Sequence, residues 1–380
     1  MSLKKYLSSK PLYYEHIDYN RMPNVFKNIS DNFRFPKVIH MAGTNGKGST
    51  GRYIAKMLEV EGFRVGHYTS PHILEFNERI YKNGKNILDD ELEVLHIRLL
   101  EILKDYEKEL SYFEYTTLLA FLYFEDCDYV VLEAGVGGEF DATNVAPKIL
   151  SVITPISIDH QNLLGNSIKE IAFTKLQSVN NKAVIAYQKH EEVMEVIKQR
   201  EAVCGFEFLY VDKDEIDDGI EKYVQKFSLP WFLKQNLLTA FQAVKSLGVS
   251  PDLSKLQALD LRGRCEKIAP NITLDVGHNI DAAKALVEHF GNKKVVLVYN
   301  SYKDKDYIEV LNILKFIIKR VELIDMVNTA RQSAERQIKE LLDSFDVEYK
   351  DYEGINGNDE YLAFGSFGVA ESFLKSLNEK

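Results

Sequence analysis

Cysteine is scarce in this chain, and its scarcity excludes one class of protein. The 380 residues contain three cysteines, Cys127, Cys204 and Cys265. No two of them stand in a CxxC pair, and their number is odd. A disulfide framework or a structural zinc site is therefore not expected, and we predict a protein of the reducing cytoplasm.

An excess of basic residues is also missing. The chain has 47 Lys and Arg against 57 Asp and Glu, a formal net charge of −10. Nucleic-acid backbones require a basic surface, so we expect no nucleic-acid partner. Small anionic substrates stay compatible with this balance, because they need only a local basic pocket.

Long apolar runs are absent as well. The most apolar stretch, YTTLLAFLYF at 115–124, is much shorter than the ~20 residues that a membrane span needs. We predict a buried helix there and no membrane association. The first residues contain no apolar core of signal-peptide length, and the chain has no internal repeat or low-complexity tract.

Short apolar runs alternate with amphipathic stretches along the chain, and this pattern predicts an α/β fold with a mostly parallel sheet. The amphipathic stretches 89–110 and 167–179 are predicted helices, the second opening with the capping-box pair Ser167 and Glu170. The acidic stretch 211–222 is predicted to be a solvated loop or edge. The predicted strands are 37–42, 64–69, 128–134, 149–154 and 182–187.

A second domain follows an interruption at 250–264, where Ser-Pro and Arg-Gly-Arg mark a connection. We predict a P-loop domain over 1–259, with a mostly parallel sheet flanked by helices, a linker over 260–263, and a smaller Rossmann-like α/β domain over 264–380. The strands expected in the second domain lie within 272–279, 293–300, 321–328 and 361–366.

The stretch KVIHMAGTNGKGSTGRYIAKML (37–58) carries the strongest chemical signal. Its glycines let the backbone approach an anion closely, and the following helix N-terminus adds partial positive charge. Lys47 supplies a full charge, and Ser49 or Thr50 a hydroxyl for Mg²⁺. In the usual P-loop sequence motif the hydroxyl residue follows the lysine directly, whereas Gly48 intervenes here. We predict a nucleotide phosphate site; the alternative is a tight turn with an exposed lysine.

Polar residues at other strand ends suggest ligands for a metal, because open α/β sheets bind at that edge. Glu133 could hold Mg²⁺ beside phosphates or lie free on the surface. Ser70 could be a ligand or a turn cap. His160 could be a ligand or a structural histidine. Lys175 by itself would be an ordinary surface lysine.

Taken together, the motifs resemble the folylpolyglutamate synthase/dihydrofolate synthase family of the Mur-ligase superfamily. AGTNGKGST resembles the family's phosphate loop, with glycine between lysine and hydroxyl. The other motifs follow in the family's order, from about residue 16 to 367: TSPH…ERI, FEYTT, LEAGVGGEFDATN, DHQNLLG, RGR, DVGHN and FGS.

The resemblance implies roles for individual residues. Lys47, His160 and Lys175 would be catalytic, with Lys175 carbamylated. The metal ligands for two Mg²⁺ ions would be Ser70, Glu133 and His160. ATP would be bound by Thr44, Asn45, Gly46, Lys47, Gly48, Ser49, Asn236, Arg264 and Asp275. The pterin substrate would be bound by Asp18, Tyr19, Phe113, Glu114, Tyr115, Thr116, Phe140, Asp141 and Ala142.

The chain also departs from the family pattern. The usual GGR reads GGE, so Glu139 reverses a charge near the substrate segment. EKAG around the modified lysine reads TKLQ, PGR reads RGR, and AHNP reads GHNI. None of these changes removes a predicted metal or phosphate ligand, although they bear on substrate preference and on the carbamylation of Lys175.

The resemblance implies a cytoplasmic, monomeric ATP-dependent ligase that adds L-glutamate to dihydropteroate and to reduced folates. An acyl phosphate would form, and the two domains would close over it. One alternative is a folylpolyglutamate synthase without the dihydropteroate activity. More remote alternatives are another Mur-type ligase, which Gly48 disfavours, a P-loop nucleotide switch, and a structural protein that binds no nucleotide.

Overall fold

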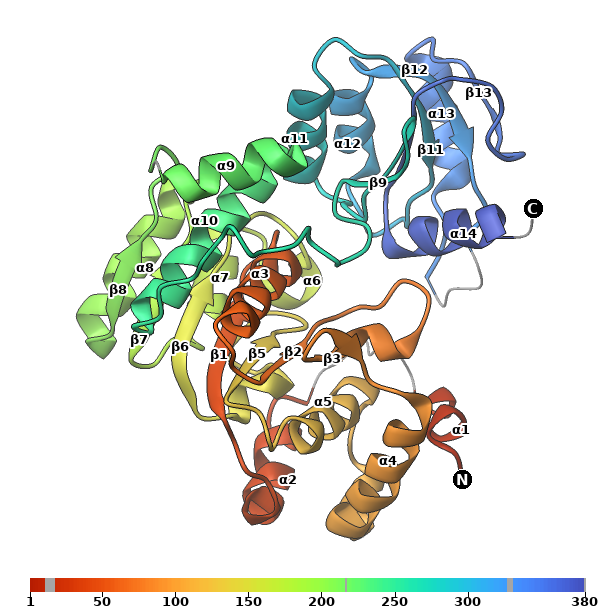
Figure 1. The fold of residues 1–380 in the computed structure, drawn as a ribbon. Coiled ribbons are helices and arrows are strands. Elements are labelled where there is room, and N and C mark those ends of the chain that lie inside the picture. Colours follow the sequence, from red (N-terminus) through yellow and green to blue (C-terminus); the bar gives the residue numbers. More distant parts are fainter. Residues whose placement is uncertain (11–17, 216, 327–330, 379–380) are drawn as a thin grey trace. The chain divides into compact units, whose positions relative to one another are not determined.

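The chain folds into two compact units. The computed structural model describes residues 1–10, 18–215, 217–326 and 331–378. One unit comprises 1–229 with 233–260, and the other 230–232 with 261–380 (Figure 1). The first unit ends at Asp260, and residues 256–261 form no helix or strand; the domain boundaries predicted from the sequence stay a prediction. Both units combine parallel strands with flanking helices, which confirms the predicted α/β class.

The first unit is built on a sheet with the order β4-β3-β2-β5-β1-β6-β7-β8. The strands from β2 to β8 in this order pair in parallel, and β3 and β4 extend the edge as an antiparallel hairpin. The strands are β1 (Lys37–Ala42), β2 (Val65–Tyr68), β3 (Ile80–Lys82), β4 (Lys85–Asn86), β5 (Tyr129–Glu133), β6 (Lys148–Ile153), β7 (Lys182–Ile185) and β8 (Glu207–Tyr210).

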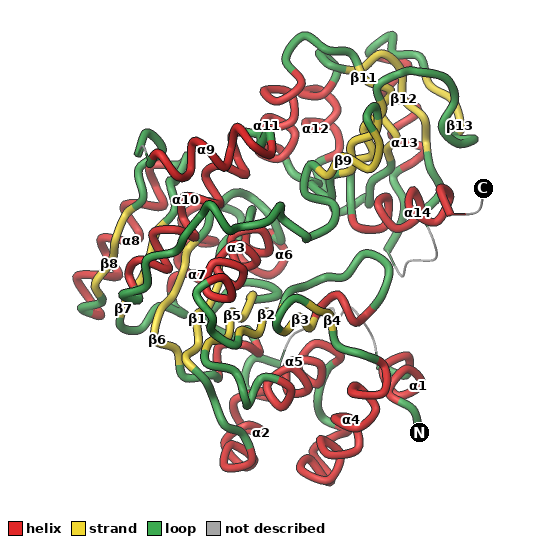
Figure 2. Tube along the Cα trace, in the orientation of Figure 1, coloured by secondary structure: helices red, strands yellow, loops and turns green. Residues whose placement is uncertain are grey.

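Helices cover both faces of this sheet (Figure 2). Alternate residues of β5 show why: Val130 and Leu132 pack with one helical layer, and Tyr129 and Val131 with the other. The first layer includes α1 (Leu3–Ser8), α2 (Arg21–Ile29), α4 (Asp89–Leu103) and α5 (Tyr112–Tyr123), and the second α3 (Lys47–Val60), α9 (Asp218–Phe227) and α10 (Trp231–Ser246). Further along the sheet lie α6 (Gln161–Leu164), α7 (Ile168–Leu176) and α8 (Glu191–Cys204).

Two local predictions are confirmed and a third holds for part of its length. Residues 115–123 of the apolar stretch 115–124 lie in the buried helix α5, and Ser167 with Glu170 forms the capping box that opens α7. The acidic stretch 211–222, predicted to be a loop or edge, is irregular at 211–215 and 217, with residue 216 outside the described residues, and is helical from Asp218, where α9 begins. Asp217 caps that helix by accepting hydrogen bonds from two amides of its first turn, at 2.9 and 3.1 Å.

The register of the parallel strands brings their carboxyl ends together. Met41 of β1 lies opposite Glu133 of β5, and Ala42 lies opposite Ile153 of β6. Tyr68 of β2 lies opposite Leu132 of β5. The segments that follow β1, β2, β5 and β6 therefore share one edge of the sheet, where open α/β sheets hold their ligands.

The second unit has a sheet of order β13-β12-β11-β14-β10-β9, parallel except for β9. Three helices share a hydrophobic core with one face, and α14 packs on β14. The strands are β9 (Glu266–Ala269), β10 (Ile272–Leu274), β11 (Val295–Tyr299), β12 (Ile318–Leu323), β13 (Tyr349–Asp351) and β14 (Tyr361–Phe364), and the helices α11 (Ile280–Phe290), α12 (Tyr307–Leu314), α13 (Glu335–Ser344) and α14 (Phe367–Asn378).

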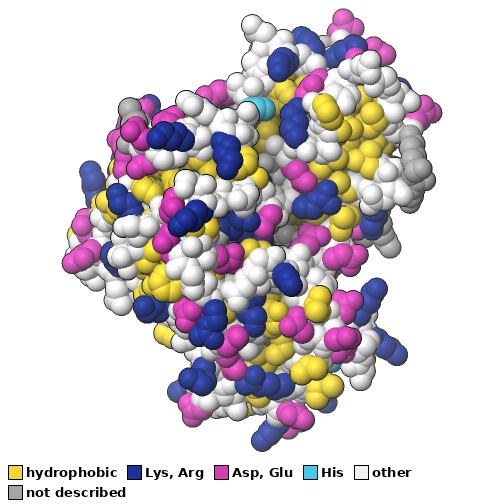
Figure 3. Space-filling view, in the orientation of Figure 1, with side chains coloured by type: hydrophobic (Ala, Val, Ile, Leu, Met, Phe, Trp, Pro, Cys, Tyr) yellow, Lys and Arg dark blue, Asp and Glu magenta, His cyan; other side chains and the backbone are white. Residues whose placement is uncertain are grey.

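The surface agrees with the composition. Acidic and basic side chains are intermingled over the face shown in Figure 3. In the described ranges, we find no helix with the length and apolar character that crossing a bilayer requires.

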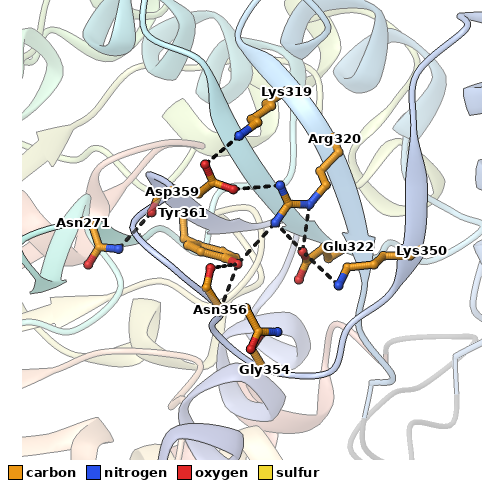
Figure 4. A network of polar contacts seen from close by, with 9 residues as sticks. All are labelled: Asn271, Lys319, Arg320, Glu322, Lys350, Gly354, Asn356, Asp359 and Tyr361. Atoms are coloured by element: carbon orange, nitrogen blue, oxygen red, sulfur yellow. Dashed lines mark hydrogen bonds and ion pairs between the residues drawn. The ribbon is translucent and has the colours of Figure 1, made fainter.

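A buried carboxylate of the second sheet lies in a network of ion pairs and hydrogen bonds (Figure 4). Glu322 of β12 is fully buried, and its Oε1 accepts hydrogen bonds from Arg320 Nε and Nη2 at 3.0 and 2.9 Å. Arg320 Nη1 also donates to Asp359 at 2.8 Å. Lys350 Nζ lies farther from Glu322 Oε1, at 3.7 Å. Arg320 is thus the main partner of a carboxylate that has no access to water.

Arg320→Met is expected to lower the free energy of unfolding by about 3 kcal/mol, because it leaves the Glu322 charge buried without its main partner. Urea unfolding at neutral pH measures the change. The control is Arg336→Met, because Arg336 pairs with Glu340 with 87 % of its side chain exposed. That change should stay within about 0.5 kcal/mol. Equal effects of the two variants would contradict the expectation.

Candidate active site

The glycine-rich segment after β1 forms a tight turn that only glycine can build. Gly46 has φ +84°, and a Cβ there would lie 2.5 Å from Asn236 Oδ1 of α10. Gly43 has φ +145°, and its Cβ would lie 2.0 Å from Thr154 Oγ1. Helix α3 begins directly afterwards, at Lys47. The predicted phosphate loop therefore has a strand before it, a helix N-terminus after it, and Asn236 against its backbone.

Contacts from the segment after β6 hold this loop in place. The amides of Thr44 and Asn45 both donate to the Pro155 carbonyl, at 2.9 and 3.1 Å. Thr44 Oγ1 donates to the Ser157 carbonyl and accepts from the Ser157 amide, each at 3.1 Å. The loop is thus fixed before any ligand binds, which lowers the cost of ordering it around a phosphate.

Two hydroxyl residues open α3. Ser49 and Thr50 are both buried. Thr50 Oγ1 has no hydrogen-bond partner within the described residues. A buried hydroxyl of this kind fits a site that a phosphate oxygen or a hydrated cation completes.

Glu133 and Ser70 meet at the ends of β5 and β2. Glu133 Oε2 accepts hydrogen bonds from the Thr69 hydroxyl and, at 3.2 Å, from the Ser70 amide. Glu133 Oε1 lies 3.9 Å from Lys47 Nζ. Lys47 Nζ also lies 3.3 Å from the Gly43 carbonyl. The structure therefore places a carboxylate and a hydroxyl residue, which can supply oxygen ligands to Mg²⁺ together with phosphate oxygens, next to a lysine at the predicted phosphate loop.

His160 lies in a more open position. Its side chain is 42 % exposed, its φ is +52°, and it precedes α6. His160 Nε2 lies 3.7 Å from Asp159 Oδ2, and the His160 amide donates to the same carboxylate at 2.9 Å. In the parts of the chain that are described, no three His, Cys, Asp or Glu side chains form a metal-binding group. The role of His160 stays a prediction.

Lys175 reaches the phosphate loop from α7. Its side chain is buried, and Nζ donates to the Gly43 carbonyl at 2.8 Å. Burial, and secondly the charge of Lys47, lower the pKa of Lys175 from 10.5 to about 7. Lys175 is therefore not an ordinary surface lysine, and much of it is a neutral amine at neutral pH.

The free energy of unfolding should rise between about pH 7 and 10 in CO₂-free, metal-free buffer, because of Lys175. In this range the unfolded chain still binds the proton at a pKa of 10.5, whereas the folded chain, with a pKa of about 7, has released it. The slope contributed is up to about 1.4 kcal/mol per pH unit. Urea unfolding of the wild type and of Lys175→Met should show the slope in the wild type alone.

The control for this titration is Lys169→Met on the exposed part of the same helix, where Lys169 pairs with Glu195. It should keep the wild-type slope. A Lys175→Met variant with that same slope would show that another group causes it.

The predicted pterin segments contain one exposed aromatic pair. The rings of Tyr19 and Phe140 lie 4.4 Å apart, with 41 % and 43 % of the residues exposed. Asp18 is also exposed, and it accepts a hydrogen bond from the Asn20 amide at 3.0 Å. Segments far apart in the sequence thus present two flat apolar surfaces to solvent.

The FEYT segment of α5 lies mostly inside. Glu114 is buried and pairs with Arg21 at 2.7 Å. Tyr115 is fully buried, and its hydroxyl lies 2.6 Å from His96 Nδ1. Thr116 lies 3.0 Å from the Tyr68 hydroxyl. These three side chains already have internal partners.

Phe113, the first residue of the FEYT segment, packs against the loop after β5. A Cβ on Gly135 would lie 2.7 Å from the Phe113 ring. The same loop is held by Asp141, whose carboxylate accepts from the amides of Gly135 and Val136 and from both the amide and the hydroxyl of Thr143. Burial raises the pKa of Asp141, and these hydrogen bonds oppose the rise. Asp141 thus shapes the loop that leads to Phe140, and the adjacent Ala142 is buried.

Arg264 and Asp275 lie in the second unit. Asp275 accepts hydrogen bonds from the Cys265 and Gly277 amides at 2.8 and 2.7 Å. Burial raises the pKa of its carboxyl, and these amides and Arg264 oppose the rise. Arg264 lies over the Phe367 ring at 5.3 Å. The nucleotide contacts predicted for both residues stay predictions.

Three hydroxyl residues that the sequence analysis missed form hydrogen bonds to predicted site residues. Thr69 donates to Glu133, and Ser157 holds Thr44. The Thr143 hydroxyl donates to Asp141, and its oxygen lies 2.8 Å from Nε2 of the buried His40 of β1. Thr69 and Thr143 lie within the motifs TSPH and LEAGVGGEFDATN, and Ser157 follows the end of β6, but these signals assign no role to the individual hydroxyls.

Comparisons with known proteins agree on one family. No protein-family model matches the chain. It is 31 % identical over 390 residues to the dihydrofolate synthase/folylpolyglutamate synthase of Haemophilus influenzae, covering 89 % of this chain and 88 % of that one. The crystal structure of Helicobacter pylori folylpolyglutamate synthetase matches with a TM-score of 0.82 and 40 % identity, over 100 % of this chain and 98 % of that one.

A third match concerns the fold. A bifunctional folylpolyglutamate synthase/dihydrofolate synthase with Mn, AMPPNP and L-glutamate bound matches with a TM-score of 0.83 and 24 % identity, over 100 % of this chain and 98 % of that one.

Proposed function

Because the chain belongs to the dihydrofolate synthase/folylpolyglutamate synthase family of ATP-dependent ligases, we propose that it joins L-glutamate to dihydropteroate and to reduced folates. One observation supports this function above the others. Lys47, Glu133, Ser70 and Lys175 meet at the phosphate loop, at the carboxyl edge of the first sheet. That group of side chains suits the activation of a carboxylate by ATP.

A carboxylate is a poor acyl donor, so it must be activated before an amine can attack it. A substrate carboxylate oxygen attacks the γ-phosphorus of ATP, the bond from that phosphorus to the bridging oxygen breaks, and ADP leaves. The resulting acyl phosphate is attacked by the α-amine of L-glutamate. Phosphate leaves, the amine loses its proton, and an amide remains. Both attacking and attacked groups of the first step are anionic, so positive charge must offset their repulsion.

The residues of the loop supply that charge. Lys47 and the amides at the start of α3 hold the β- and γ-phosphates. Glu133, Ser70 and His160 would hold divalent metal, with the buried Thr50 hydroxyl beside the phosphates. When bound, the metal neutralises phosphate charge. Asn236, Arg264 and Asp275 are assigned to the nucleotide, as the family resemblance implies.

We assign carbamylation to Lys175, with a pKa of about 7 in support. The neutral Nζ attacks the carbon of CO₂, an N–C bond forms, and one proton passes to water. The product is an anion that attracts Lys47, whereas the protonated form of Lys175 would repel it. Native mass spectrometry should show the added mass of one CO₂, lost after acid treatment and absent in Lys175→Met.

The exposed rings of Tyr19 and Phe140 are assigned to the pterin end of the acceptor, because flat aromatic rings stack favourably. The protein is further proposed to act as a cytoplasmic monomer, with the first unit as the ATP-binding domain and the second as the glutamate-ligase domain. Sedimentation velocity tests the oligomeric state.

The experiment that tests the function supplies ATP, Mg²⁺ and L-glutamate with either dihydropteroate or tetrahydrofolate, and products are identified by mass. A product one glutamyl unit heavier, with matching ADP release, is expected from each acceptor. Product from tetrahydrofolate alone would restrict the protein to folylpolyglutamate synthesis. Nucleotide hydrolysis without product from either acceptor would contradict a ligase and favour a nucleotide switch.

A further inference from the structure

The connection between the two units begins at a charged cluster on helix α3. We infer that Asp260, the last residue of the first unit, is a positioning residue: Arg52 and Lys56 hold its carboxylate and so fix the start of the connection to the phosphate-loop helix. The consequence for ligation rests on the proposed function, whereas the position of the connection does not. Nothing in the predicted site uses these three residues.

Two cationic side chains of α3 form ion pairs with the carboxylate of Asp260. Arg52 Nη1 lies 3.2 Å from Oδ1, and Lys56 Nζ lies 2.9 Å from Oδ2. The two cations are four residues apart on α3, so they lie on one side of the helix. Each carboxylate oxygen therefore has its own cation, which fixes the orientation of the carboxylate better than a single ion pair would.

Arg52 is itself held rigidly. Its side chain is 3 % exposed, its Nε donates to His67 Nδ1 at 3.1 Å, and its guanidinium lies 3.6 Å over the Tyr81 ring. The Tyr81 hydroxyl in turn donates to Glu59 at 3.0 Å. Asp260 contacts a preorganised guanidinium, so little side-chain entropy is lost in forming this contact.

The electrostatics make Asp260 the natural counter-ion of Arg52. Burial lowers the pKa of Arg52, and Asp260 is the first group that opposes this effect. His67, the other polar neighbour, is kept neutral because burial and the Arg52 charge lower its pKa well below the ordinary value. Glu59 has a pKa raised by burial. Without Asp260 the guanidinium would lose the anion that it contacts directly.

The position of Asp260 in the chain explains what its contact with Arg52 and Lys56 would do. Arg52 follows Lys47 by five residues on the same helix, a rise of about 7.5 Å. Residues 256–261 have no helix or strand of their own, so side-chain contacts decide their path. The chain enters the second unit directly after Asp260. The contact thus ties the start of the connection to the body that carries the phosphate loop, and hinge positions of this kind affect turnover without touching substrate.

The test compares Asp260→Asn with Asp252→Asn, a matched control. Asp252 lies in the same irregular stretch and pairs with Lys255 at 3.1 Å. Its carboxylate therefore pairs with a residue outside α3. Backbone ¹⁵N order parameters of the amides of 258–263 are the first readout. Asp260→Asn should lower them from about 0.85 to below about 0.6, and Asp252→Asn should leave them unchanged. Asp260→Glu should restore most of the wild-type rigidity.

Steady-state kinetics give the second readout. Asp260→Asn should lower the kcat of glutamate ligation by about tenfold, because misplacement far from the chemistry reduces reactive alignment, while the Kd for ATP stays within about twofold. Lys56→Met should act in the same direction and serves if Asp260→Asn folds poorly.

Order parameters at 258–263 in Asp260→Asn that match the control would overturn the inference, whether or not the wild type is active. Lower order parameters with unchanged kcat would overturn the functional half. A wild type that forms no glutamylated product would instead refute the proposed function, and the order parameters would still decide whether Asp260 fixes the connection.

Discussion

Replacing Lys47 by methionine is expected to lower the kcat of ligation by about 10²–10³-fold, the loss found when a preorganised charge-stabilising donor is removed. Methionine keeps the length and the apolar stem of the side chain but removes the charge. Lys47 Nζ lies against the Gly43 carbonyl and 3.9 Å from Glu133, so it is already directed into the loop. Single-turnover rates of ADP formation with saturating acceptor measure the effect.

The control for this substitution is Lys37→Met, at the amino end of β1, the strand that leads into the phosphate loop. Lys37 Nζ lies over the Tyr129 ring at 5.0 Å, remote from the phosphate loop along β1. Its removal should leave kcat within about twofold. A Lys47→Met enzyme that keeps more than a tenth of wild-type kcat would show that Lys47 does not carry the γ-phosphate charge.

Lys47 also affects its neighbour. Its charge is the second cause, after burial, of the lowered pKa of Lys175. Removing Lys47 should therefore raise the pKa of Lys175 and reduce the fraction of neutral amine at pH 7. The two lysines are coupled, and a double variant should lose less activity than the product of the two single losses.

Much of the first sheet could be predicted because its central strands are buried on both faces. A strand such as β5, with every residue buried, reads as a continuous apolar run. Because parallel strands end at one edge, Glu133 at the end of its strand was predicted as a possible metal ligand beside the phosphates. The metal role of Ser70 came only from the family resemblance. The apolar run and the polar residue that ends it are both local features of the sequence.

Contacts made across the fold could not be predicted in the same way. The hairpin of β3 and β4 is short and half exposed, so it leaves no apolar pattern. The burial of Tyr115 against His96 depends on how α4 packs on α5. Lys175 has the sequence of an ordinary helical lysine, and its altered pKa arises only because α7 places it beneath the Gly43 carbonyl.

Glu133→Gln is expected to raise the Mg²⁺ concentration for half-maximal activity by at least about 30-fold and to lower kcat by about 10²-fold. Glutamine keeps the volume at the buried end of β5 but removes the anionic oxygen that hard cations prefer. It also leaves Lys47 without the carboxylate 3.9 Å away. Magnesium titrations of ligation at fixed ATP measure both effects.

The matched control for Glu133→Gln is Asp128→Asn, which changes a carboxylate at the amino end of the same strand. Asp128 pairs with Arg64 at 3.0 Å on the surface. Its loss should leave the magnesium dependence unchanged, since surface ion pairs contribute at most about 1 kcal/mol to stability. Glu133→Asp should recover part of the activity, because the charge returns one methylene short of its place. A Glu133→Gln enzyme with lower kcat and a wild-type magnesium requirement would mean that Glu133 positions Lys47 and Thr69 and is not a metal ligand.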